Sequence, residues 1–149
     1  MKLFRPTGDV KVIEVKYPEV EFPPVRENRD PNEVYVSIPK PTGKMKIERF
    51  EQIELELVPE TVDYIMDNKG GGTLERIRQL ILHMFNHRYY TDLDLFGLMR
   101  NADDEHVELV LNIIESCSLK YGDSCFKMID DLAPKMIDRF GYADREEEE

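Results

Sequence analysis

The stretch from Thr73 to His87 constrains the fold most, because its apolar residues recur at the spacing of one helical face. Those residues are Leu74, Ile77, Ile81, Met84 and Phe85, and Leu80 and Leu82 widen the face. An apolar face this wide is typical of a helix at the centre of a helical core. Gly70, Gly71 and Gly72 precede the stretch, and the hydroxyl of Thr73 is placed to cap it. We therefore predict a central helix around which other helices pack.

Two shorter helices are predicted on either side of the central one. Pro59 suits the first turn of the earlier helix, which ends at about Asn68. Thr91 or Asp92 is placed to cap the later one. Their apolar residues are Val62, Ile65 and Met66 in the first and Leu95, Leu98 and Met99 in the second.

Two longer helices complete the predicted bundle. Asp103 is placed to cap the first, and Asp123 opens the second. Their apolar stripes are Val107, Val110, Leu111, Ile114 and Cys117 in the first and Phe126, Ile129, Ala133, Met136 and Phe140 in the second. The last stripe keeps its phase across Pro134, so we predict one kinked helix there, ended by Gly141 as its C-terminal cap.

The first 58 residues alternate like strands and are interrupted by prolines. Strands are predicted at residues 10–17, 33–38 and 45–58, with a turn at 39–44 in which Gly43 is able to take a positive φ. The fold class is thus α+β, a proline-interrupted ribbon followed by a bundle of four to five helices. We divide the chain into a β-rich segment at 1–58, a helical domain at 59–141 and a disordered acidic tail at 142–149.

The net charge of −11 limits the classes of partner. Residues 73–149 carry 9 Lys/Arg and 17 Asp/Glu, a net charge of −8, against −3 for residues 1–72. Such a surface repels nucleic-acid phosphates and attracts basic proteins, so direct nucleic-acid binding is disfavoured. No apolar run approaches the roughly 20 residues that span a bilayer, and the first residues lack a signal-peptide core. We expect a cytoplasmic protein that does not enter a membrane.

Carboxylates gather around the predicted starts of two helices and form the candidate partner-binding site. They are Asp92, Asp94, Asp103, Asp104, Glu105 and Glu108. Tyr89 and Tyr90 precede them, and aromatic residues beside charges are typical of interface centres. The alternative is a solvated helix face with ordinary capping. The functional interpretation is a docking surface for a basic groove, including imitation of nucleic-acid charge.

Three other patterns suggest chemistry less specifically. His83 and His87, four residues apart on the central helix, suit zinc if His106 or Asp92 supplies a third ligand. Lys69 stands before its glycines, whereas a phosphate-binding P-loop places Lys after them. Cys117 and Cys125 are predicted to be small buried side chains in a reducing compartment. We expect no cofactor and no metal, with a His83/His87 metal enzyme as the alternative.

The segment from Gly70 to Ile114 resembles a small uncharacterised bacterial domain family carried on phages and plasmids. The resemblance rests on apolar positions together with Asn86, Asp92 and Leu95. It implies an origin on a mobile element and transfers no catalytic residue.

Together these patterns predict a non-enzymatic acidic interaction module. Its partner would be a basic surface of a host protein, such as a nucleic-acid-binding protein that a phage- or plasmid-borne inhibitor blocks. The N-terminal strands would add to that partner or join two copies of the chain into a homo-oligomer.

Overall fold

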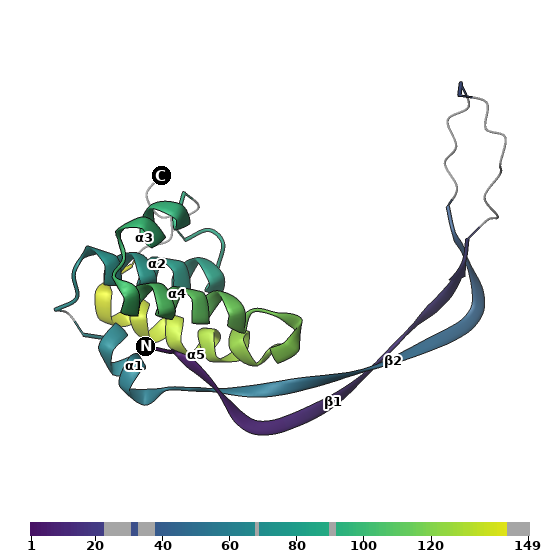
Figure 1. Cartoon of the computed structure of the whole chain (residues 1–149), viewed down its shortest axis with the longest axis horizontal. Helices are drawn as coiled ribbons and strands as arrows, with labels where there is room; N and C mark the ends of the chain where they lie inside the picture. The colour runs from purple at the N-terminus through teal and green to yellow at the C-terminus, as the bar shows by residue number, and fades with distance from the viewer. Residues whose placement is uncertain (23–30, 33–37, 68, 90–91, 143–149) are drawn as a thin grey trace. The chain divides into compact units, whose positions relative to one another are not determined.

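The computed structural model describes residues 1–22, 31–32, 38–67, 69–89 and 92–142. An antiparallel hairpin precedes the helices, as the predicted α+β class requires (Figure 1). The elements are β1 (Phe4–Glu21), β2 (Lys40–Leu57), α1 (Pro59–Ile65), α2 (Gly72–Phe85), α3 (Leu95–Asn101), α4 (Asp104–Ser116), the 3₁₀ turn η1 (Leu119–Tyr121) and α5 (Ser124–Phe140). None of these helices is both long and apolar enough to cross a membrane.

The chain divides into two compact units. The helical unit comprises Met1–Lys11 and the chain from Gln52 onward, and the hairpin unit is Val12–Glu51. The base of the hairpin thus belongs with the helices. Asn112 of α4 fixes it there, because its side chain accepts hydrogen bonds from the backbone N–H groups of Leu3 and Phe4, at 2.8 and 2.9 Å, and donates to the Phe4 carbonyl at 3.0 Å.

Helix α2 is the centre of the helical core, as predicted. Its Ile77, Ile81 and Leu82 are fully buried, and the helix packs against α3, α4 and most extensively α5. Phe4, the first residue of β1, and Leu3 before it join the same core. The apolar face of α2 is wide because it has neighbours on several sides, which is what the sequence pattern indicates.

Arg78 is a buried residue of α2 that the apolar pattern did not predict. Its guanidinium donates from Nε to the Ile65 carbonyl at 2.7 Å, from Nη1 to Glu75 at 3.2 Å, and also from Nη2 to the Asp67 carbonyl. The carbonyls at the end of α1, which lack helical partners, are satisfied in this way. The guanidinium also lies 4.2 Å from the centroid of the Phe140 ring. One side chain thus connects α1, α2 and α5.

The buried face of α4 differs from the predicted stripe. Leu111 and Ile114, placed in that stripe, are 53% and 41% exposed. Val110 of the stripe is buried as predicted, and the other buried residues are Leu109, Ile113 and Ser116, which lie outside it. Both sets have helical spacing, because apolar residues occur around most of this helix. Apolar periodicity alone therefore did not determine which face of α4 is buried. The packing of α4 against α2 determined it.

The last helix follows the prediction more closely. Helix α5 continues through Pro134, and Gly141 ends it at φ +70°, with its N–H donating to the Ile137 carbonyl at 2.8 Å. Asp123 precedes the helix, but its side chain makes no capping hydrogen bond. Phe126, predicted to lie on the buried face, is 41% exposed.

Three boundary predictions were wrong. Helix α2 begins at Gly72, so Thr73 lies inside it and does not cap it. The strands are longer than predicted, and β2 begins at Lys40 inside the predicted turn, where Gly43 does take a positive φ of +79°. Such glycine conformations bend a strand without ending it. Tyr142, assigned to the tail, donates from its hydroxyl to Glu75 at 2.8 Å. The predicted strand at 33–37 and the tail at 143–149 lie outside the described residues.

Candidate interaction site

Two of the predicted partner-binding carboxylates are helix caps. Asp94 Oδ1 accepts the Gly97 N–H at 2.8 Å at the start of α3, and Asp103 Oδ1 accepts the His106 N–H at 2.9 Å at the start of α4. The predicted cap at Asp103 is confirmed. The prediction of Thr91 or Asp92 as the cap of α3 is wrong, because the helix begins later, after Asp94. Thr91 itself lies outside the described residues.

Asp103 also holds His106, one of the two candidate third metal ligands, in place. Its Oδ1 lies 2.7 Å from His106 Nδ1, and the other ring nitrogen, Nε2, lies 2.8 Å from the Tyr64 hydroxyl. The backbone hydrogen bond from His106 lowers the pKa of Asp103, whereas burial raises the pKa of Tyr64. Tyr64 is therefore held as a neutral phenol, and the arrangement connects α1 to the start of α4.

The remaining carboxylates of the cluster differ in what they contact. Asp104 and Glu105 are exposed in the first turn of α4, and their side chains form no hydrogen bond or ion pair with the described part of the chain. Glu108 pairs with the Met1 ammonium group, whose hydrogen bond lowers the pKa of that carboxyl. Asp92 is exposed. The carboxylates that a partner reaches without breaking a known contact are those of Asp104 and Glu105.

The structure describes only one of the two tyrosines predicted at the partner-binding site. Tyr89 is half-buried and packs against the hydrophobic core, and its carbonyl lies 2.9 Å from His83 Nδ1. Tyr90 lies outside the described residues. Tyr89 therefore has a structural role in the core.

The two histidines of the metal hypothesis do not lie on one helical face. His83 is in α2, but α2 ends at Phe85, so His87 follows in the next turn and is exposed. The expectation that both project from one face is wrong. No group of three or more His, Cys, Asp and Glu side chains suitable for a metal occurs within the ranges that the structure describes.

We predict that purified protein contains no stoichiometric zinc, because His83 and His87 do not share a helical face and His106, one of the two candidate third ligands, contacts Asp103 and Tyr64. Elemental analysis of untagged protein measures this. Near one equivalent of zinc, lost in the double variant His83→Ala/His87→Ala, would contradict the prediction and favour the enzyme alternative.

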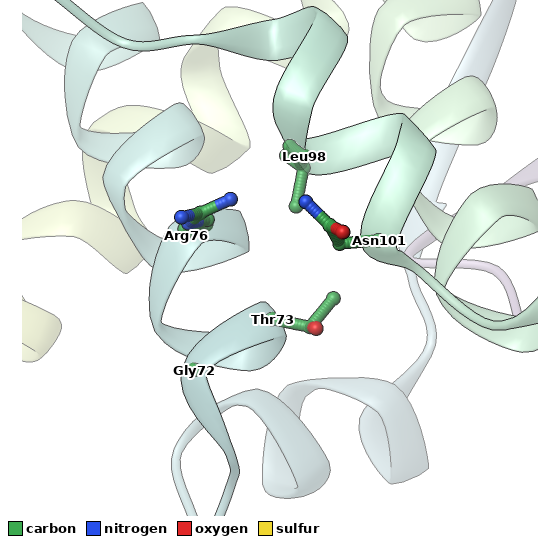
Figure 2. A pocket seen from close by; sticks show the side chains of 5 residues that line it. All are labelled: Gly72, Thr73, Arg76, Leu98 and Asn101. Atoms are coloured by element: carbon green, nitrogen blue, oxygen red, sulfur yellow. The ribbon is translucent and has the colours of Figure 1, made fainter.

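A hollow of about 260 Å³ opens where α2 begins. Figure 2 shows Thr73 and Arg76 of α2 facing Leu98 and Asn101 of α3 across it. The preceding element is helix α1, whereas a P-loop follows a strand. Arg76 is exposed, and Asn101 donates to the carbonyl of Gly97 at 2.8 Å. The phosphate-loop interpretation of Lys69 and its glycines gains no support from this geometry.

Comparison of the chain with family models, curated proteins and solved structures found no match in any of the three. The resemblance to a phage and plasmid domain family therefore stays a prediction.

Proposed function

We propose that this protein is a non-enzymatic interaction module whose helical unit binds a basic surface of a partner protein. The distribution of charge is the observation that carries this proposal. The helical unit holds 13 Lys/Arg and 23 Asp/Glu, a net charge of −10, whereas the hairpin unit holds 7 and 8, a net charge of −1. Charge concentrated in one unit attracts oppositely charged partners over about a Debye length and accelerates their association.

The start of α4 is the proposed contact within that unit. Asp104 and Glu105 are exposed there, directly after Asp103, which caps the helix. Positively charged side chains of the partner would pair with these carboxylates at small desolvation cost, since both carboxylates face solvent. A nucleic-acid-binding protein offers the complementary surface, and occupying it would inhibit that protein. The resemblance to mobile-element domains favours a host protein as the target and the cytoplasm as the location.

We predict that neutralising Asp104 and Glu105 slows partner association. The double variant Asp104→Asn/Glu105→Gln removes two steering charges and leaves both the Asp103 cap and the Glu108–Met1 pair intact. The partner is first captured from a bacterial lysate and identified, and association rates are then measured at low and physiological salt. We expect a rate roughly 3- to 10-fold lower at low salt and a weaker salt dependence for the variant.

The matched control is Asp130→Asn/Asp131→Asn, which removes the same charge from exposed positions of α5. Equal rates for the α4 variant and the wild type would contradict the proposed contact. An equal fall in association rate for the α4 and α5 variants would show that the net charge accelerates binding without a defined contact site.

The hairpin unit supports a second element of the proposal, self-association. None of its described residues is buried, and Val12, Met45 and Ile47 are each more than half exposed. Two-stranded hairpins are at best marginally stable alone in water, so covering this surface would stabilise it. Pro18 and Pro41 lie within the strands and lack an N–H donor, which disfavours addition of another strand at the edges and favours packing on a face.

The charges of the hairpin suit a second copy of the chain. Within the described hairpin residues, the β1 side carries Lys16 against three glutamates, and the β2 side carries four basic residues against two acidic ones. The glutamates are Glu14, Glu19 and Glu21, and the residues of the β2 side are Lys40, Lys44, Lys46, Arg49, Glu48 and Glu51. Stacking β1 of one copy over β2 of the other would place opposite charges together.

We predict a dimer that the double variant Val12→Ser/Ile47→Ser dissociates, because it removes apolar area from the proposed contact. Light scattering coupled to size exclusion measures the mass. Leu111→Ser/Ile114→Ser is the control, since it changes exposed apolar residues of α4 in the helical unit. A monomeric wild type, or equal dissociation of both variants, would contradict this part of the proposal.

A further inference from the structure

The turn between α4 and α5 brings the two cysteines of the chain together. Cys117 directly follows α4, and Cys125 is the second residue of α5. Between them, η1 and Gly122 at φ +56° reverse the chain. Both side chains contact groups on the last turn of α4. Both cysteines are free thiols in this structure.

Ser116 completes a small polar cluster inside the apolar core. Its hydroxyl donates to the Ile113 carbonyl at 2.6 Å and lies 3.0 Å from Cys125 Sγ. Cys117 Sγ lies 3.4 Å from the same carbonyl. Both sulfur atoms are thus held near one point by groups on the last turn of α4, which limits their rotation and keeps them close.

The two thiols differ in access and acidity. Cys125 is fully buried, whereas Cys117 is partly exposed. The hydrogen bond from Cys125 lowers the pKa of Cys117 to about 7, and the same contact raises the pKa of Cys125. Because the thiolate is the nucleophilic form of cysteine, Cys117 is the thiol that meets an oxidant from solvent and reacts with it first.

We propose that Cys117 and Cys125 form a reversible oxidation site in which a hydroperoxide oxidises Cys117 and Cys125 then closes an intramolecular disulfide. In the first step the Cys117 thiolate attacks one peroxide oxygen, the O–O bond breaks, and an alcohol or water leaves as Cys117 becomes a sulfenic acid. In the second step Cys125 Sγ attacks the sulfenic sulfur, the S–O bond breaks, and water leaves. The two sulfur atoms supply the two electrons that reduce the peroxide, and a dithiol reductant reverses the reaction.

This site suits a reducing compartment, where reversible disulfides serve redox sensing more often than structure. It is independent of the acidic surface at the start of α4. The disulfide would link the end of α4 to the first turn of α5 through a short loop of the chain.

The test treats the full chain with hydrogen peroxide, alkylates the remaining thiols and digests the protein with trypsin. Lys120 lies between the cysteines, so trypsin separates peptide 101–120 from peptide 121–127 unless a disulfide joins them. We expect the joined pair, two hydrogens lighter than the sum of its peptides, and its loss after treatment with dithiothreitol. Three results for the wild-type protein would overturn the proposal. They are two thiols that both stay reduced, a disulfide between two chains, and a sulfinic acid at Cys117 beside a reduced Cys125.

Two conservative variants assign the roles of the thiols. In Cys125→Ser, oxidation should stop at a Cys117 sulfenic acid that dimedone traps. In Cys117→Ser, the buried Cys125 should stay reduced under the same dose. Circular dichroism checks that each variant is folded. Trapping at Cys125 in a folded Cys117→Ser variant, at the rate seen for Cys117, would contradict the assignment.

Discussion

Replacing Ile81 with Asp is expected to unfold the helical unit. Ile81 is fully buried in the central helix α2, and the guanidinium of the buried Arg78, three residues earlier, is already bonded to two backbone carbonyls and to Glu75. The variant loses the burial of an isoleucine and places an unpaired charge, or a carboxyl forced to stay protonated, in an apolar core. The expected cost is roughly 5 kcal/mol or more, which is comparable to the whole stability of an ordinary domain.

Thermal unfolding monitored by circular dichroism measures this effect. We expect loss of the cooperative transition, or a fall in Tm of about 10–20 °C. Gln79→Asp is the control, because it adds the same charge to a partly exposed position of the same helix. A soluble Ile81→Asp variant with unchanged Tm would show that α2 is not the centre of the core.

Replacing Arg78 with Met is expected to be the second most destabilising change. Arg78 is 3% exposed, and its guanidinium bonds the Ile65 and Asp67 carbonyls and Glu75. Methionine keeps most of the volume but leaves these buried acceptors without their donor, and each such group costs about 1–3 kcal/mol. Glu75 loses the hydrogen bond from Arg78 but keeps the one from the Tyr142 hydroxyl, so this carboxylate is not left without a donor. We expect a total cost of about 2–4 kcal/mol.

The measurement is the free energy of unfolding by urea, with Arg76→Met as the control. Arg76 is exposed two residues earlier on the same helix, so the control removes the same charge without removing buried hydrogen bonds. Arg78→Lys should recover only part of the loss, because a lysine lacks the planar fork that reaches several acceptors at once. Equal stability of the Arg76 and Arg78 variants would contradict the role assigned to Arg78.

The helical elements were largely readable from the sequence because their signals are local. Apolar spacing predicted α2 as the centre of the bundle, and the chemistry of single side chains predicted the Asp103 and Gly141 caps and the passage of α5 through Pro134. A hydrogen bond within one turn depends only on residues that are neighbours in the chain. Such features need no knowledge of the tertiary structure.

The site was readable only in part. Sequence spacing identified the acidic cluster, but it did not distinguish the carboxylates that cap helices or pair with Met1 from those left exposed at Asp104 and Glu105. It also placed His83 and His87 on one face, whereas the end of α2 at Phe85 separates them. The end of a helix is set by the packing of the following chain as well as by local preference.

By itself, then, the sequence determined the α+β class, the central helix, two helix ends and the concentration of negative charge in the helical unit. The tertiary structure decided which face of α4 is buried, that Arg78 satisfies the end of α1, and that Cys117, Cys125 and Ser116 meet. These outcomes depend on contacts between residues of different elements. Periodicity gives the side chains that share a face, but the neighbouring elements decide which face is covered and what a polar side chain finds there.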